Sequence, residues 1–74
     1  MSSYKLSVVF EKDKDGYFAF CPELQGCYAQ GDTIEEVTQN IQDAIKLHIK
    51  DRLDAGEEIP QPDSVSFTTM EIAV

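Results

Sequence analysis

Residues 32–56, Asp-Thr-Ile-Glu-Glu-Val-Thr-Gln-Asn-Ile-Gln-Asp-Ala-Ile-Lys-Leu-His-Ile-Lys-Asp-Arg-Leu-Asp-Ala-Gly, are the only stretch long enough for a substantial helix. Thr33 can cap the first turn, and Glu36 three residues later completes a capping box. Gly56 suits the position after the last turn, because glycine adopts a left-handed backbone at little cost. The sequence therefore predicts one long helix with a defined start and end.

Apolar side chains recur along this helix at steps of three and four residues, which places them on one stripe. The expected buried stripe consists of Ile34, Val37, Ile41, Ala44, Ile45 and His48. One apolar stripe needs one apolar surface to cover. The rest of the chain is expected to supply that surface as a β-sheet.

Three short strands are expected before the helix and one after it. Residues 4–12 alternate apolar and polar side chains, and the polar turn that follows predicts a hairpin to residues 17–21. Residues 27–30 and the β-favouring residues 65–74 complete the set. The predicted fold class is α+β with the element order β-β-β-α-β. We expect a four-stranded mixed sheet of order 3-2-1-4, with the helix on one face.

The second expected strand is apolar on both faces. Tyr17, Ala19 and Cys21 share one face, whereas Phe18 and Phe20 share the other. A strand of this kind usually has both faces covered. The single helix can cover only one of them, so we expect a second copy or another protein on the other.

Composition narrows the class of protein. The chain has 74 residues and a formal charge of −8 from fourteen acidic and six basic residues. Direct nucleic-acid binding is disfavoured, because it needs a basic patch. A basic protein partner and simple solubility both fit this charge.

A chain this short buries only about 60% of its unfolded surface, so oligomerisation would add useful burial. No stretch resembles a membrane span or a signal peptide, which predicts a cytoplasmic protein.

No catalytic residue, metal site or cofactor site is expected. His48, the one histidine, lies within the apolar stripe, where packing explains it without catalysis. Glu11, Glu36 and Glu71 fall on different elements, and a metal site would require them to converge. Cys21 and Cys27 are too few for a disulfide framework or a zinc site. They are expected to be reduced and buried, the alternative being a disulfide between neighbouring strands.

One continuous pattern resembles a known family. Residues 16–27, Gly-Tyr-Phe-Ala-Phe-Cys-Pro-Glu-Leu-Gln-Gly-Cys, and residues 29–37, Ala-Gln-Gly-Asp-Thr-Ile-Glu-Glu-Val, resemble the HicB family of type II antitoxins. The family pattern runs roughly G-Y-x-A-x-x-P-x-L-x-G-C and then G-D-T-x-E-E-A, with Val37 here in place of the last alanine. Residues 56–62 look like the family's linker after the helix.

The resemblance implies a single HicB-like domain over residues 1–74, with a reduced ribonuclease-H-like core that lacks working nuclease carboxylates. Longer relatives carry a C-terminal DNA-binding domain, which is not expected here. The resemblance also implies a partner, since HicB-like antitoxins bind HicA-like toxins. These toxins are small basic ribonucleases that cleave mRNA, and the antitoxin occludes their active site. We therefore expect a non-enzymatic antitoxin module.

The expected partners are a HicA-like toxin and further copies of the chain, as a homodimer or larger assembly, without direct nucleic-acid binding or membrane contact. The candidate residues for a partner or dimer interface are Phe18, Phe20, Tyr28, Glu57 and Glu58. The alternative is an orphan homo-oligomeric structural or binding domain without a toxin partner.

Overall fold

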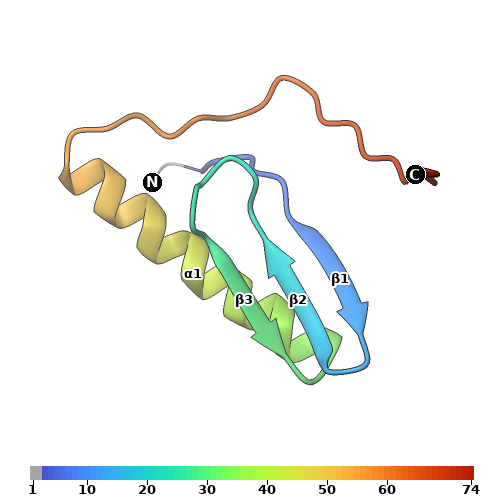
Figure 1. The fold of residues 1–74 in the computed structure, drawn as a ribbon. Coiled ribbons are helices and arrows are strands. Elements are labelled where there is room, and N and C mark those ends of the chain that lie inside the picture. Colours follow the sequence, from blue (N-terminus) through green and yellow to red (C-terminus); the bar gives the residue numbers. More distant parts are fainter. Residues whose placement is uncertain (1–2) are drawn as a thin grey trace.

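The computed structural model describes residues 3–74. Three strands precede one helix: β1 (Val9–Asp13), β2 (Gly16–Phe20), β3 (Tyr28–Gly31) and α1 (Ile34–Asp54). The strands form an antiparallel sheet of order β1-β2-β3, which confirms the predicted meander (Figure 1). The fold is α+β, with one helix behind a three-stranded sheet in this view.

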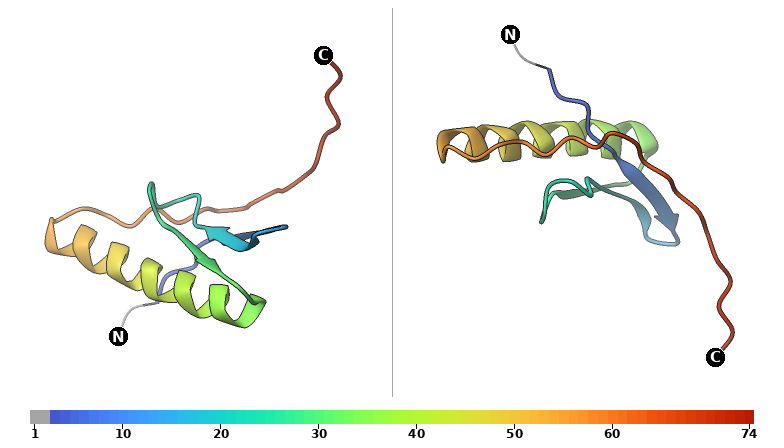
Figure 2. Two further views of the ribbon diagram at one scale, coloured as in Figure 1. Left: turned by 60° about the horizontal axis from the view of Figure 1, so that its bottom comes forward. Right: turned by 90° about the horizontal axis from the view of Figure 1, so that it is seen from above.

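The helix covers only part of the sheet. Within residues 3–74, α1 contacts β2 and β3 but not β1. The fully buried side chains lie between these elements and the loop that joins β2 to β3: Ala19, Cys21, Leu24, Cys27, Val37 and Ile41. The core is therefore centred on β2 and β3, and β1 lies beyond the cover of the helix (Figure 2).

Both ends of α1 have the predicted caps. The Thr33 hydroxyl accepts a hydrogen bond from the Glu36 N–H at 3.0 Å, and the Asp32 N–H donates to the Glu36 carboxylate at 3.4 Å. At the other end, Gly56 has a φ of 77°, and its N–H donates to the Leu53 carbonyl. The Glu36 N–H and the Leu53 carbonyl are thereby paired at the helix ends, while the Glu36 carboxylate bonds the N–H of Asp32 rather than that of the N-cap Thr33.

The predicted buried stripe is largely confirmed. Val37 and Ile41 are buried, while Ala44, Ile45 and His48 are half-buried. Ile34 is 41% exposed, so its assignment to the core was wrong. Ile34 stays exposed because α1 comes into close contact with the sheet only further along the helix. A Cβ on Gly31 would lie 2.6 Å from the Val37 nitrogen, so close contact with β3 begins almost one turn after Ile34.

The loop between β2 and β3 is fixed by its own backbone bonds. The Cys21 N–H donates to the Cys27 carbonyl, and the Cys27 N–H donates to the Leu24 carbonyl, both at 3.0 Å. Leu24 is thereby held in the core at 1% exposure. The Glu23 carboxylate accepts from the Ser7 N–H at 2.7 Å and so ties the segment before β1 to this loop.

The first strand is shorter than the predicted residues 4–12. Pairing with β2 ends at the Val9–Phe20 pair. Beyond Phe20, the Cys21 N–H is bonded to Cys27, and Pro22 has no N–H to donate. Residues 4–8 therefore find no ladder partner, although Leu6 and Val8 still pack against the core.

The predicted fourth strand is not confirmed. Residues 65–74, which we call the apolar arm, adopt no strand and are exposed throughout. The arm runs away from the sheet beyond β1 (Figures 1 and 2). Strand propensity alone does not hold a strand, because the ladder needs a bonded neighbour. The order 3-2-1-4 therefore stays a prediction with regard to its fourth member.

Replacing Thr33 by Ala is expected to destabilise the fold by about 1 kcal/mol, since the Glu36 N–H loses its acceptor. Urea unfolding followed by circular dichroism would measure the change. Thr33→Ser keeps the hydroxyl and should stay close to the natural chain. Equal losses in the two variants would contradict a capping role.

Both cysteines are free thiols in the core, so the disulfide alternative is not what the structure shows. Burial raises the pKa of the Cys21 thiol and of the Cys27 thiol above the usual thiol range. The folded chain thus holds these protons more tightly than the unfolded chain. The resulting stability is present below the unfolded thiol pKa and is lost as the pH rises towards the folded pKa.

The free energy of unfolding should therefore fall between neutral pH and about pH 10, partly because of these thiols. Urea titrations at both pH values would measure the fall. A Cys21→Ala, Cys27→Ala variant is the control, since it removes both thiols and leaves every other ionisable group in place. An equal fall in this variant would show that the thiols contribute nothing.

Candidate partner-binding face

Three aromatic side chains gather on the sheet face that α1 leaves open. Ala19 and Cys21 point into the core, so by alternation Phe18 and Phe20 point to the opposite face. The ring centroid of Phe18 lies 6.0 Å from that of Phe20 and 5.9 Å from that of Tyr28. The three residues therefore form one continuous aromatic cluster across β2 and β3.

The cluster is accessible from outside. Tyr28 is 60% exposed, and Phe18 and Phe20 are each half-buried against their neighbours. Figure 1 looks onto this face, with α1 on the far side of the sheet. Aromatic side chains bring large apolar area to an interface at a low cost in conformational entropy. An uncovered group of three is thus a suitable anchor for another macromolecule.

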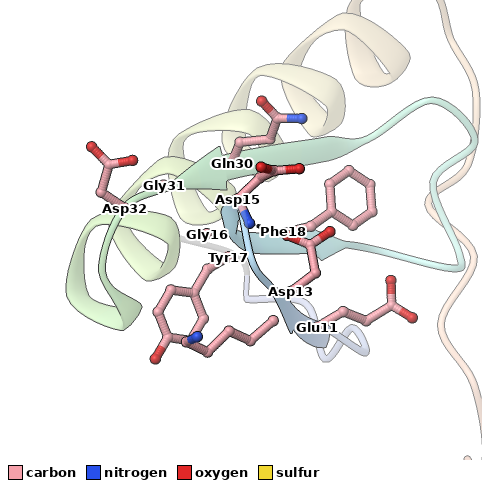
Figure 3. A pocket seen from close by; sticks show the side chains of 10 residues that line it. Glu11, Asp13, Asp15, Gly16, Tyr17, Phe18, Gln30, Gly31 and Asp32 are labelled. Atoms are coloured by element: carbon pink, nitrogen blue, oxygen red, sulfur yellow. Dashed lines mark hydrogen bonds between the residues drawn. The ribbon is translucent and has the colours of Figure 1, made fainter.

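Acidic side chains border the cluster. Glu11 of β1 pairs with Phe18 across the ladder, and Asp13 follows in the same row. Together with Gln30, they line an open hollow of about 550 Å³ at one end of the sheet. Figure 3 shows Glu11, Asp13 and Phe18 on one side of β1 and β2, and Tyr17 on the other. The face therefore combines an aromatic centre with a negatively charged rim.

The structure does not gather the other candidate groups into a site. Within residues 3–74, no group of three His, Cys, Asp or Glu side chains is arranged to hold a metal ion. Glu11 lies in β1, Glu36 caps α1 and Glu71 lies in the apolar arm. His48 is half-buried on α1. Across the same residues, no helix combines the length and the apolar composition needed to cross a membrane.

The five predicted interface residues fall into two places. Phe18, Phe20 and Tyr28 come together on the sheet face. Glu57 and Glu58 instead follow the end of α1, where the Glu57 N–H closes the helix on the Arg52 carbonyl at 2.9 Å. The Glu57 carboxylate also lies 3.8 Å from the Arg52 guanidinium. These two acidic residues are exposed but are not part of the aromatic cluster.

Sequence reasoning missed the acidic rim. Alternation in the first strand already placed Glu11 on the side opposite Phe10. The missing information was the register of the hairpin, which sets Glu11 directly beside Phe18 and Val9 beside Phe20. Counting back from the turn before Gly16 would have given this pairing.

Comparison with known proteins identifies the family. Residues 4–72 match the family model described as "HicB_like antitoxin of bacterial toxin-antitoxin system". A UPF0150 protein of Synechocystis is 46% identical over 63 residues, which cover 84% of this chain and 80% of the relative. A UPF0150 protein of Helicobacter pylori strain J99 is 50% identical over 52 residues, covering 70% of this chain and 71% of the relative.

A more distant match comes from a phage. An uncharacterised 14.9 kDa protein of Haemophilus phage HP1 is 36% identical over 58 residues, which cover 78% of this chain but 44% of that protein. No solved structure matches the chain. The family match spans both the sheet that carries the aromatic cluster and the helix behind it, and the chain belongs to the HicB-like antitoxins of bacterial toxin–antitoxin systems.

Proposed function

We propose that this chain neutralises a HicA-like mRNA-cleaving toxin by covering its active site with the aromatic face of the sheet. The observation that carries the proposal is the uncovered cluster of Phe18, Phe20 and Tyr28 on an antitoxin-family fold. Membership of this family indicates a toxin–antitoxin role and a non-enzymatic one. The HicA-like partner and the use of this face are our proposal.

Charge supports the same kind of partner. The chain carries a formal charge of −8, and Glu11 and Asp13 bring part of it to the edge of the aromatic cluster. A ribonuclease must present a basic surface to bind phosphates. An acidic rim would steer the antitoxin to that surface and compete with RNA for it. The aromatic rings would then supply most of the binding free energy at the centre.

The four-stranded sheet of order 3-2-1-4, and with it the reduced ribonuclease-H-like core, is part of this proposal. It is supported by the segment just before the apolar arm. The Lys5 N–H donates to the Gln61 side chain at 2.6 Å, and residues 5–7 and 62–65 line a common hollow. The two segments run in the same direction there, as a parallel fourth strand beside β1 requires (Figure 1).

The proposal is tested with the product of an adjacent reading frame that encodes a small basic protein. That protein is expected to cleave mRNA in vitro, and an equimolar amount of this chain should suppress the cleavage. Binding should weaken as salt rises, because the acidic rim acts through screened charges. Unimpaired cleavage in the presence of the folded chain would contradict the proposal, and would favour a homo-oligomeric domain without a toxin.

Truncating the aromatic cluster should weaken toxin binding strongly. Phe18→Ala or Tyr28→Ala is expected to cost about 2 kcal/mol, which corresponds to roughly a thirtyfold rise in Kd. Isothermal titration calorimetry would measure it. Leu47→Ala is the matched control, since Leu47 is a large side chain that is 62% exposed on α1 rather than on the sheet. A larger effect at Leu47 than at Phe18 would place the interface on the helix.

A further inference from the structure

The two cysteines lie directly opposite each other at one end of the β2–β3 ladder. The last pair of this ladder is Phe20 with Tyr28, so the next pair in the same register is Cys21 with Cys27. Their backbones are joined at this point, because the Cys21 N–H donates to the Cys27 carbonyl at 3.0 Å. The two thiols are therefore neighbours across the strands.

Both thiol side chains point to the same side of the sheet. Cys21 and Cys27 are each 2% exposed and belong to the core that α1 covers. Opposite residues of an antiparallel pair have Cβ atoms about 4.5–5.5 Å apart, whereas a disulfide needs about 3.5–4.5 Å. The sulfurs can therefore join after a small approach of the two strand ends, without a change of register.

The connection between the cysteines holds them in this position. The Leu24 N–H donates to the Cys21 carbonyl at 3.1 Å, and the Cys27 N–H donates to the Leu24 carbonyl at 3.0 Å. Two successive turns thus fill the connection. Pro22 fixes φ in the first turn, and Gly26 supplies the φ of 81° that the second turn needs. The thiols are consequently held opposite each other by a short and rigid segment.

A carboxylate lies beside one of the two sulfurs. The Cys21 thiol donates to the Glu23 carboxylate, with 3.7 Å between sulfur and oxygen. A thiol reacts as its thiolate, and a carboxylate within hydrogen-bond reach can accept the proton. Burial raises the pKa of both thiols, so we expect a slow reaction that proceeds when the connection opens locally. Pro22, Gln25 and Gly26 are exposed, so this opening leaves the rest of the core packed.

We propose that Cys21 and Cys27 are a reversible thiol–disulfide pair, which a peroxide oxidises to a bridge that closes residues 21–27 into a ring. The structure shows the reduced form, in which both thiols are free. The bridge would join the end of β2 to the start of β3 on the core side. Phe20 and Tyr28 are the adjacent pair, so the same bridge ties together the strands that carry the aromatic cluster. This inference is independent of the toxin.

The oxidation balances with one molecule of hydrogen peroxide. The Cys21 thiolate attacks a peroxide oxygen, so that an S–O bond forms, the O–O bond breaks, and the leaving hydroxide takes up the thiol proton as water. The Cys27 sulfur then attacks the sulfur of the sulfenic acid. An S–S bond forms, the S–O bond breaks, and hydroxide leaves with the Cys27 proton as a second water. A dithiol reductant reverses the reaction by thiol–disulfide exchange.

Peptide mapping tests whether the bridge forms. The folded full chain is treated with an excess of hydrogen peroxide at neutral pH, and is then cleaved after Glu23, which lies between the two cysteines. We expect the two resulting peptides to stay joined until dithiothreitol is added. Free thiols, oxygen added to either cysteine without a bridge, or a disulfide between two chains would each overturn the proposal.

Thermal unfolding followed by circular dichroism tests what the bridge does. Oxidation should raise the Tm of the natural chain by about 10 °C, because the ring restricts the unfolded chain, and dithiothreitol should restore the original Tm. Cys27→Ala is the matched control, since it keeps Cys21 but cannot form the ring. An equal rise in this variant, or an unchanged Tm in the oxidised natural chain, would exclude a stabilising bridge. If Cys27→Ala does not fold, the oxidised and reduced natural chains still provide the comparison.

Discussion

The structure depends on one constraint: a single helix has to cover a sheet that is wider than the helix. α1 places Val37 and Ile41 over β2 and β3, and within residues 3–74 the other fully buried side chains lie on β2 and on the segment that joins it to β3. The outer face of the sheet and the strand β1 are consequently left without cover. The aromatic cluster that we connect with binding and the exposure of Phe10 on β1 are both consequences of this shortage.

Local signals in the sequence were sufficient for much of this fold. The helix and both of its ends followed from Thr33, Glu36 and Gly56, because capping is a short-range interaction. The prediction that β2 is apolar on both faces followed from the alternation of side chains along the strand. The length of β1 could not be predicted in this way. It depends on β2, where the ladder ends at Phe20 because the next N–H, that of Cys21, donates to the Cys27 carbonyl. Residues 65–74 have the composition of a strand, but composition does not provide the hydrogen-bonded neighbour that a strand needs.

The candidate face was predictable to a similar extent. Phe18 and Phe20 followed from their alternation with Ala19, and Tyr28 joins them because β3 pairs with β2 in antiparallel register. Glu11 and Asp13 depend on cross-strand register, which a reading along one strand does not provide. Glu57 and Glu58 were predicted as interface residues because they are acidic and lie in the expected exposed linker after the helix. The 21 residues of α1 span about 31 Å, which carries the linker away from the start of the helix.

The exposed arm also bears on how long the molecule survives in a cell. Proteases engage extended, solvent-accessible segments more readily than packed ones. The arm and its Pro60–Pro62 linker present such a segment, whereas six side chains among residues 3–74 are fully buried in the core. A protease would therefore cut this segment before it could reach the packed core. The lifetime of the protein would then be set by its exposed C-terminal segment rather than by the stability of its core.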